Sequence, residues 1–154
     1  MKTDFLVIGS GAAGLSFALR AARYGHVTLV TKGELVECNT NYAQGGICSV
    51  TYPPDTFEKH IEDTLVCGAG KCDRKAVELV VRRAPEAARD LIEWGVNFDK
   101  TPDGRFDLHR EGGHSEHRIL HHNDLTGAEI ERALIERVRS DANITVLEHH
   151  SAID

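Results

Sequence analysis

The chain has 154 residues, which is enough for one domain with one sizeable core. Hydrophobic residues make up 41% and charged residues 27%, as in ordinary soluble globular proteins. The net charge of −6 disfavours nucleic acid as a partner, since that binding needs a basic face. It also disfavours an anionic membrane surface.

The four cysteines, Cys38, Cys48, Cys67 and Cys72, form no Cys-x-x-Cys pair, so we expect reduced thiols and a cytoplasmic location. The apolar stretch at residues 5–22 has the outline of a signal peptide. However, Asp4 lies where such a leader is basic, and glycines recur in the stretch at fixed spacing. No other stretch approaches the ~18 apolar residues of a membrane span.

The first 31 residues predict a strand, a helix and a second strand. Residues 5–8 are apolar and end at Gly9, as a strand buried on both faces does in a parallel sheet. Apolar residues then recur at helical spacing between residues 11 and 23, and Gly25 ends that helix. Residues 27–31 predict a second buried strand, which completes a βαβ unit.

The rest of the chain predicts a helical excursion and a third strand. Residues 32–52 lack periodicity, so we expect a long functional loop there. Helices are expected at residues 55–66 and after Asp73; in the second, Pro85 should produce a kink or a break, and Val80 belongs to the apolar stripe. Thr126 and Glu129 predict a capping box for a helix that reaches residue 139. Its buried face is expected to be Ile130, Ala133, Leu134 and Val138.

Residues 144–147 predict the third strand. The fold class is therefore α/β, with a parallel sheet whose βαβ N-terminal unit precedes a helical excursion and a third strand. Because three strands are few for such a sheet, we expect exposed apolar surface and an unpaired sheet edge.

A glycine motif, Gly9-x-Gly11-x-x-Gly14, lies between the first strand and the first helix. Gly9 permits a tight turn, Gly11 lets a pyrophosphate approach the backbone, and Gly14 lets helix and strand pack closely. The amino end of the helix adds N–H groups and partial positive charge. The motif predicts dinucleotide binding; the alternative is a glycine-rich turn that only packs.

The end of the second strand lacks the acidic residue that commonly binds the ribose hydroxyls, and carries Thr31 and Lys32 instead. Two explanations compete at this point. A cation could meet the 2′-phosphate of NADP, or the chain could belong to a flavoprotein group without this acid.

The segment at residues 39–47, Asn-Thr-Asn-Tyr-Ala-Gln-Gly-Gly-Ile, favours the flavoprotein. Together with the glycine motif and residues 31–33, it resembles the succinate dehydrogenase and fumarate reductase flavoprotein superfamily. Residues 110–127 and 62–73 resemble the L-aspartate oxidases within that superfamily. The resemblance covers the whole chain in register.

The resemblance implies a partial FAD-binding Rossmann-like domain. Residues 1–154 would be the N-terminal portion of that domain, and the capping and C-terminal helical domains would lie outside the chain. The implied FAD contacts are Gly9, Ser10, Gly11, Ala12, Ala13, Gly14, Lys32, Asn39, Thr40, Asn41, Tyr42, Ala43, Gln44, Gly45 and Gly46. Small and amide residues suit such a loop because backbone N–H groups can approach the flavin without steric cost.

Asn39 predicts how FAD is held. Succinate dehydrogenases carry in this loop a histidine that bonds covalently to the flavin, and Asn39 matches its position. Since an amide cannot form that linkage, we expect non-covalent FAD.

Glu111 is the candidate catalytic residue, because it lies in a glycine-rich loop and the resemblance implies a carboxylate near the amino group of the substrate. L-aspartate differs from succinate by one ammonium group, with which a carboxylate can pair. It could also accept a proton as the amine becomes an imine. The alternative is an ordinary surface charge.

Four histidines, His114, His117, His121 and His122, lie close together in the sequence. The i, i+4 spacing of His117 and His121 is compatible with a metal site, but neither an acid nor a cysteine completes a recognisable ligand set. We therefore expect no metal. His114 and Arg118 are expected to line the flavin or substrate cavity.

By resemblance, the whole enzyme would oxidise L-aspartate to iminoaspartate and pass the electrons to oxygen or fumarate. A functional link to quinolinate synthase in NAD biosynthesis would follow, and the 154 residues alone would be inactive. Two alternatives remain. One is a succinate- or fumarate-type subunit that docks on an iron–sulfur partner, and the other is a non-catalytic nucleotide-binding fragment.

Overall fold

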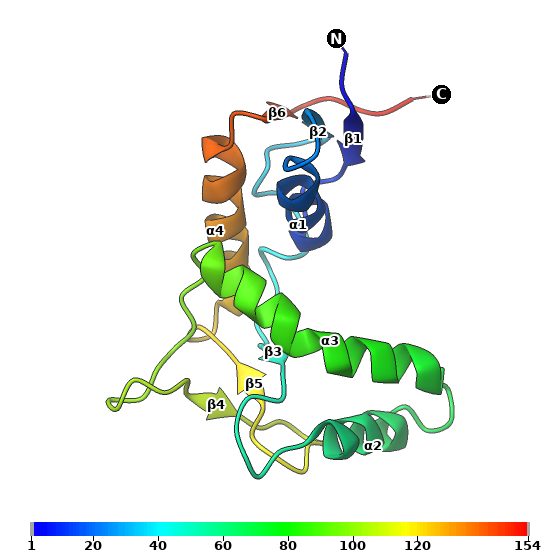
Figure 1. Cartoon of the computed structure of the whole chain (residues 1–154), viewed down its shortest axis with the longest axis vertical. Helices are drawn as coiled ribbons and strands as arrows, with labels where there is room; N and C mark the ends of the chain where they lie inside the picture. Colours follow the sequence, from blue (N-terminus) through cyan, green and yellow to red (C-terminus); the bar gives the residue numbers. More distant parts are fainter. Residues whose placement is uncertain (1, 154) are drawn as a thin grey trace. The chain divides into compact units, whose positions relative to one another are not determined.

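The structure, a computed structural model, describes residues 2–153, and the chain divides into two units, each with its own sheet and helices (Figure 1). Unit 1 comprises the chain up to Gln44, the short segment Trp94–Val96 and the chain from Leu125 onward. Unit 2 comprises Gly45–Glu93 and Asn97–Asp124.

Unit 1 is built on a parallel sheet of β1 (Phe5–Ile8), β2 (Val27–Val30) and β6 (Ile144–Leu147), in the order β1-β2-β6. Helices α1 (Ala12–Ala21) and α4 (Thr126–Ser140) contact each other on one side of this sheet (Figure 1). The predicted βαβ unit and third strand are therefore confirmed.

The core of unit 1 lies between the two helices and the sheet. Leu15 on α1, Leu29 on β2 and Leu134 on α4 are fully buried. Burying a side chain of this size contributes about 1.5–3 kcal/mol. The stripe predicted for α4 is confirmed, since Ile130, Ala133, Leu134 and Val138 are all buried.

The two faces of β1 differ. Val7 is buried, but Leu6 and Ile8 are 59% and 65% exposed. The expectation of a strand buried on both faces is thus wrong for β1, because α1 packs on one side of this edge strand and the described chain leaves the other side uncovered. The expected unpaired edge and exposed apolar surface are confirmed.

Unit 2 combines two packed helices with a small antiparallel sheet. Helix α2 (Phe57–Cys67) begins after Thr56, whose hydroxyl accepts a hydrogen bond from the N–H of Lys59. The strands β3 (Ile47–Cys48), β4 (Leu108–His109) and β5 (Ile119–Leu120) pair in the order β3-β5-β4. The sequence did not predict these strands, because two residues are too few to show a period of two.

Helix α3 (Arg74–Glu93) continues through Pro85 and is not broken there. Its buried residues are Val81 and Ala88, whereas Val80 is 66% exposed and does not belong to the buried stripe as predicted. Thr126 is not the predicted N-cap of α4 but its first helical residue, because Leu125 holds the N-cap position. The carboxylate of Glu129 pairs with Arg132.

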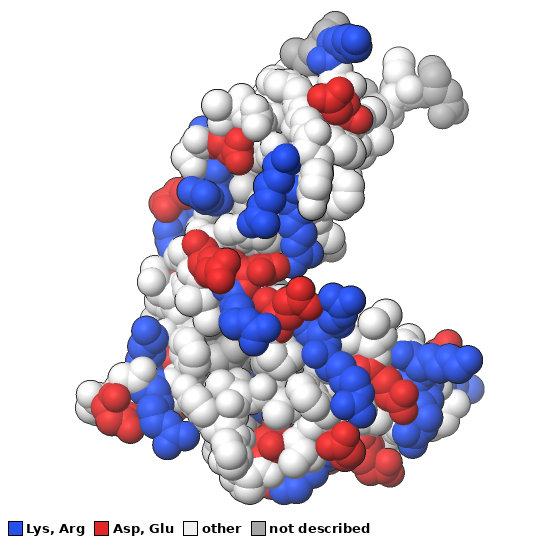
Figure 2. All heavy atoms as spheres, viewed as in Figure 1, with Lys and Arg blue, Asp and Glu red and all other residues white. Residues whose placement is uncertain are grey.

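Acidic and basic side chains are interspersed on the visible face of the molecule, without separation by sign (Figure 2). Among the described residues, no helix has the length and apolar character needed to cross a membrane.

We predict that Gly14→Ala destabilises unit 1. A Cβ on Gly14 would overlap the carbonyl oxygen of Gly9, which is backbone and cannot move aside cheaply. Overpacking of this kind costs about 1–3 kcal/mol of stability. Replacing glycine by alanine inside a helix normally stabilises it by roughly 1 kcal/mol, so the overpacking should outweigh this gain. Denaturant unfolding measures the difference.

Gly33→Ala is the matched control, because the nearest atom to a Cβ there is the Cβ of Glu37 at 3.8 Å. If Gly14→Ala left the unfolding midpoint as high as Gly33→Ala, the close approach of α1 to the first turn would be disproved.

Candidate functional site

A cavity of about 460 Å³ lies in unit 1 at the carboxyl ends of β1 and β2. Its wall includes residues from the glycine motif, the end of β2 and the following loop: Gly9, Ser10, Gly11, Thr31, Lys32 and Cys38. In parallel α/β sheets, ligands bind at this end of the strands. The cavity therefore lies where the glycine motif predicts a dinucleotide.

The glycine motif has the geometry that its spacing predicts. Gly9 has φ +104°, in the left-handed region that favours glycine. Gly11 is the N-cap of α1, and the first turn of α1 contains no acidic residue. The positive end of the helix dipole is thus not neutralised from within the helix, as an anion site requires.

The loop after β2 returns to this helix end. The hydroxyl of Thr40 accepts a hydrogen bond from the N–H of Ala12 at 3.0 Å, and a Cβ on Gly11 would lie 3.3 Å from the same oxygen. The N–H of Gly127, on α4, donates to the carbonyl of Ala43 at 3.0 Å. The loop is therefore held between the amino ends of α1 and α4.

The hydroxyls of Ser10 and Thr31 lie 3.2 Å apart, so they join the glycine motif to the end of β2, where a dinucleotide site commonly has an acid. Further along the loop, the Tyr42 hydroxyl donates to both oxygens of Glu37, and this hydrogen bond raises the pKa of Tyr42. The Tyr42 ring is turned to Glu37 and is largely exposed.

The predicted cofactor run crosses the boundary between the units. Residues 39–44 belong to unit 1, whereas Gly45 and Gly46 belong to unit 2. Gly46 precedes β3, where a Cβ would overlap the carbonyl oxygen of Leu120. A Cβ on Gly45 would lie 3.9 Å from Oε1 of Glu111. The structure thus brings Glu111 beside the end of the predicted cofactor loop.

Glu111 is exposed, and a buried ion-pair network holds the loop that carries it. Arg118 is 0% exposed; its Nε and Nη2 donate to the two oxygens of Asp55 at 2.9 and 2.8 Å, and its Nη1 donates to Asp63 at 2.5 Å. Ser115 donates both its N–H and its hydroxyl to Asp63 at 2.8 Å. The expectation that Arg118 lines a cavity is therefore wrong, because its guanidinium is fully used inside unit 2.

Asp63 is ionised within this network. Although burial would by itself raise its pKa, the hydrogen bonds from Ser115 and Arg118 lower the pKa to about 2. A carboxylate so held contributes stability that is lost as the pH falls from its ordinary pKa of 3.8 through about 2. Asp55 and Asp63 were missed in the sequence because they precede Arg118 by more than fifty residues.

A second buried carboxyl, Glu131 on α4, lies in unit 1 and is 0% exposed. Its oxygens have no hydrogen-bond partner of good geometry among the described residues. Burial raises the pKa of Glu131 to about 7, and the nearby Cys38 thiol offsets this only in part. The sequence contained a signal for its burial, because Glu131 precedes the buried Leu134 and Val138 by three and seven residues.

Cys38 connects this carboxyl to the cavity, whose wall it helps to form. Burial raises the pKa of the Cys38 thiol, and the adjacent Glu131 raises it further, while the backbone N–H of Asn41 opposes the change. The thiol is therefore kept protonated and is a poor nucleophile.

Comparison with known proteins connects this geometry to a cofactor. The family described as the FAD binding domain matches residues 4–154. The chloroplastic L-aspartate oxidase of Oryza sativa subsp. japonica is 52% identical over 151 residues, which cover 98% of this chain and 23% of that protein. The L-aspartate oxidase of Vibrio cholerae is 49% identical over 158 residues, covering 99% of this chain and 30% of that protein.

Solved structures agree on the fold. E. coli quinol fumarate reductase FrdA superimposes with a TM-score of 0.89 at 27% identity, covering 97% of this chain and 26% of that one. Mycobacterium smegmatis Sdh1 gives a TM-score of 0.87 at 31% identity, covering 97% and 28%. The chain thus spans between 23% and 30% of the lengths of these four proteins.

We predict that Glu131→Gln removes a pH dependence of stability. The unfolded chain ionises this carboxyl near its ordinary pKa of 4.5, whereas the folded chain holds the proton until about pH 7. The free energy of unfolding should therefore fall by about 3 kcal/mol as the pH rises through that window. Denaturant unfolding at both ends of the window measures this fall.

Glu136→Gln, on the same helix, is the control, because the Glu136 side chain is 69% exposed. Only Glu131→Gln should flatten the pH profile and raise the stability above pH 7. A profile identical in Glu131→Gln and in the unaltered chain would show that Glu131 is not the titrating group.

Proposed function

Because the chain belongs to the FAD-binding domain family, we propose that its glycine motif, Lys32 and the loop at residues 39–46 contact FAD. The observation that carries this proposal is the packing of Thr40 on the amino end of α1, beside the cavity at the ends of β1 and β2. The residues fit the group, since a Cβ on Gly9 would meet no atom within 4 Å and its φ of +104° suits glycine, which leaves the backbone open there to a diphosphate.

Each part of the cavity has a proposed task. The backbone N–H groups at the start of α1 would hold the diphosphate, and Lys32 would add positive charge beside it. The Ser10 and Thr31 hydroxyls stand in place of the usual acid as polar partners at the end of β2. The loop after Asn39 would face the flavin, and an amide at that position supports non-covalent binding.

For the whole protein we extend the proposal to the oxidation of L-aspartate to iminoaspartate, with oxygen or fumarate as electron acceptor. Bound FAD would supply the hydride acceptor. The curated relatives named L-aspartate oxidase support this reaction, as does the Glu111 carboxylate beside Gly45. Glu111 would pair with the substrate ammonium and take up a proton as the imine forms.

The product would be consumed by quinolinate synthase in NAD biosynthesis. The reducing cytoplasm is the proposed compartment, because Cys38, Cys48, Cys67 and Cys72 are all free thiols. The plant relatives are named chloroplastic, so the cytoplasm is proposed for the present chain and not for those relatives.

A succinate- or fumarate-type flavoprotein is the second candidate, favoured by the fold likeness to FrdA and Sdh1. The two candidates differ in the charge of the substrate that Glu111 would meet. A carboxylate attracts the ammonium of L-aspartate and gains nothing from succinate, so substrate preference distinguishes them.

The flavin proposal predicts the behaviour of a chimera in which residues 1–154 replace the matching part of the Vibrio cholerae L-aspartate oxidase. The purified chimera should carry FAD, and acid precipitation should leave the yellow colour in the supernatant. Colour in the pellet would contradict non-covalent binding, and a colourless chimera that is folded would contradict FAD binding itself. The 154-residue chain alone should show no turnover.

Glu111→Gln in this chimera tests the catalytic proposal. We expect kcat/KM for L-aspartate to fall by about 100-fold, because both charge pairing and proton acceptance are lost. Reduction of fumarate by the same flavin should change much less, since fumarate has no ammonium group. Measured oxygen consumption and fumarate-dependent dye oxidation give the two rates.

Glu116→Gln is the control in the same loop, because Glu116 pairs with Lys59 at 2.6 Å and has no proposed role in the reaction. If Glu111→Gln reduced both activities equally, Glu111 would act on the loop structure and not on the substrate ammonium. Preference of the unaltered chimera for succinate would favour the second candidate.

A further inference from the structure

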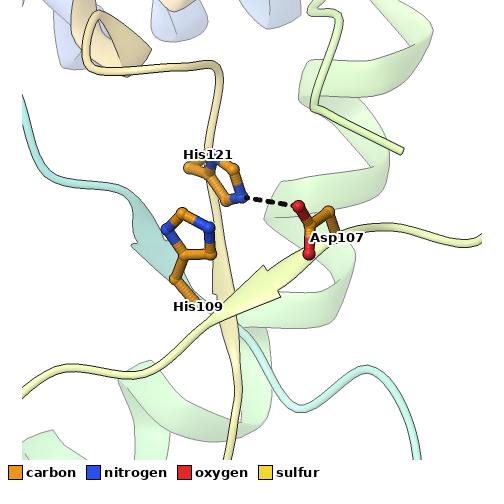
Figure 3. Close-up of side chains that lie close together, drawn as sticks. All are labelled: Asp107, His109 and His121. Atoms are coloured by element: carbon orange, nitrogen blue, oxygen red, sulfur yellow. Dashed lines mark ion pairs between the residues drawn. The ribbon is translucent and has the colours of Figure 1, made fainter. Parts of the chain in front are cut away.

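Three side chains with metal-binding atoms meet in unit 2, outside the residues assigned to the cofactor (Figure 3). Asp107 directly precedes β4, His109 ends β4, and His121 directly follows β5. One ligand atom from each lies within 4.8 Å of the others. The pairing of β4 with β5 creates this group, because His109 lies opposite Ile119, two residues before His121.

His121 lacks the hydrogen bonds that a buried imidazole normally has. The residue is 6% exposed, and both of its ring nitrogens are buried without a hydrogen-bond partner among the described residues. An unsatisfied buried polar atom costs free energy, so native structures usually provide a partner. In Figure 3, the His121 ring points its nitrogen at Asp107, with Nε2 3.8 Å from Oδ2.

The other ring nitrogen of His121 faces a different carboxylate. Its Nδ1 lies 3.3 Å from Oδ2 of Asp99, and the N–H of Asn123 donates to the same Asp99 oxygen at 2.7 Å. A carboxylate beside one nitrogen favours the tautomer that carries its proton there. It leaves the lone pair of the other nitrogen free, and metal-ligating histidines commonly have this arrangement.

His109 and Asp107 complete the group from the solvent side. The His109 ring is stacked on the His121 ring, with centroids 3.6 Å apart and an interplanar angle of 23°. His109 is exposed and Asp107 is half-exposed, so an ion can enter and water can occupy its remaining positions. Two imidazoles and one carboxylate suit Zn²⁺ and neighbouring divalent ions.

We propose that Asp107, His109 and His121 bind a divalent first-row transition-metal ion of the zinc type, with Asp99 as the carboxylate that orients His121. The ion would bind the lone pair that His121 directs away from Asp99, and small side-chain shifts would bring the three ligand atoms to bonding distance. It would also join β4 to β5, which pair over only two residues. The site does not depend on FAD or on the proposed reaction.

Zn²⁺ titration of the tag-free chain against a chromophoric chelator tests this proposal. We expect one ion per chain in the unaltered protein. Asp107→Asn and His109→Ala should each weaken binding by at least about tenfold, because each removes a ligand. Both residues are at the surface, so these variants should fold, and circular dichroism checks that they do.

His117→Ala is the matched control. His117 lies two residues before β5, is exposed, and bonds the Leu108 carbonyl through Nδ1 at 2.9 Å. Its loss should leave Zn²⁺ affinity unchanged. Zn²⁺ should also raise the melting temperature of the unaltered chain and of His117→Ala more than that of the two ligand variants.

Two results would overturn the site. One is unaltered protein that binds Zn²⁺ no more tightly than Asp107→Asn or His109→Ala. The other is an equal loss of affinity in His117→Ala, which would indicate scattered surface histidines.

Discussion

The close contact between Gly14 on α1 and the Gly9 carbonyl at the end of β1 is the constraint on which unit 1 depends. It leaves no room for a Cβ, and it sets the amino end of α1 beside the carboxyl ends of β1 and β2. The cavity lies at that position, and next to it the hydroxyl of Thr40 accepts a hydrogen bond from the N–H of Ala12. An anion at this place meets a helix end without an acidic side chain in its first turn.

The two units treat buried charge in opposite ways. Arg118 in unit 2 meets two carboxylates, and every buried charge in that network has a partner. Glu131 in unit 1 has no such partner, so burial raises its pKa to about 7 and the carboxyl stays protonated below that pH. The first arrangement stiffens the loop that carries Glu111. The second destabilises the folded chain next to Cys38, which directly precedes the proposed cofactor loop. Carboxyl groups with a raised pKa are frequent at functional sites.

The spacing of the histidines suggested helical geometry, but the structure places them around a strand. His117 and His121 have the spacing of neighbours on a helix, yet His117 precedes β5 and His121 follows it. In an extended chain, residues four apart are well separated along the strand. His117 bonds the Leu108 carbonyl, whereas His121 lies close to Asp99, Asp107 and His109, which come from a different segment.

Much of the structure of unit 1 was predictable from local sequence, because a glycine motif and an apolar strand are each recognised from residues that are close together in the chain. The βαβ unit, the third strand and the buried stripe of α4 were all predicted. In unit 2 the helices were predicted, but β3, β4 and β5 were not. Strands of two residues are stabilised by their partners, so their own sequence contains no periodic signal.

The same division applies to the candidate site. The sequence alone determined the glycine motif, the loop at residues 39–46 and Glu111 as residues of interest, since each belongs to a continuous motif. Only the tertiary structure decided that Thr40 packs on α1, that Glu111 lies beside Gly45, and that Arg118 is buried between Asp55 and Asp63. The physical reason is that burial, ion pairing and metal ligation join residues far apart in the chain, and their strength depends on distances that only folding sets.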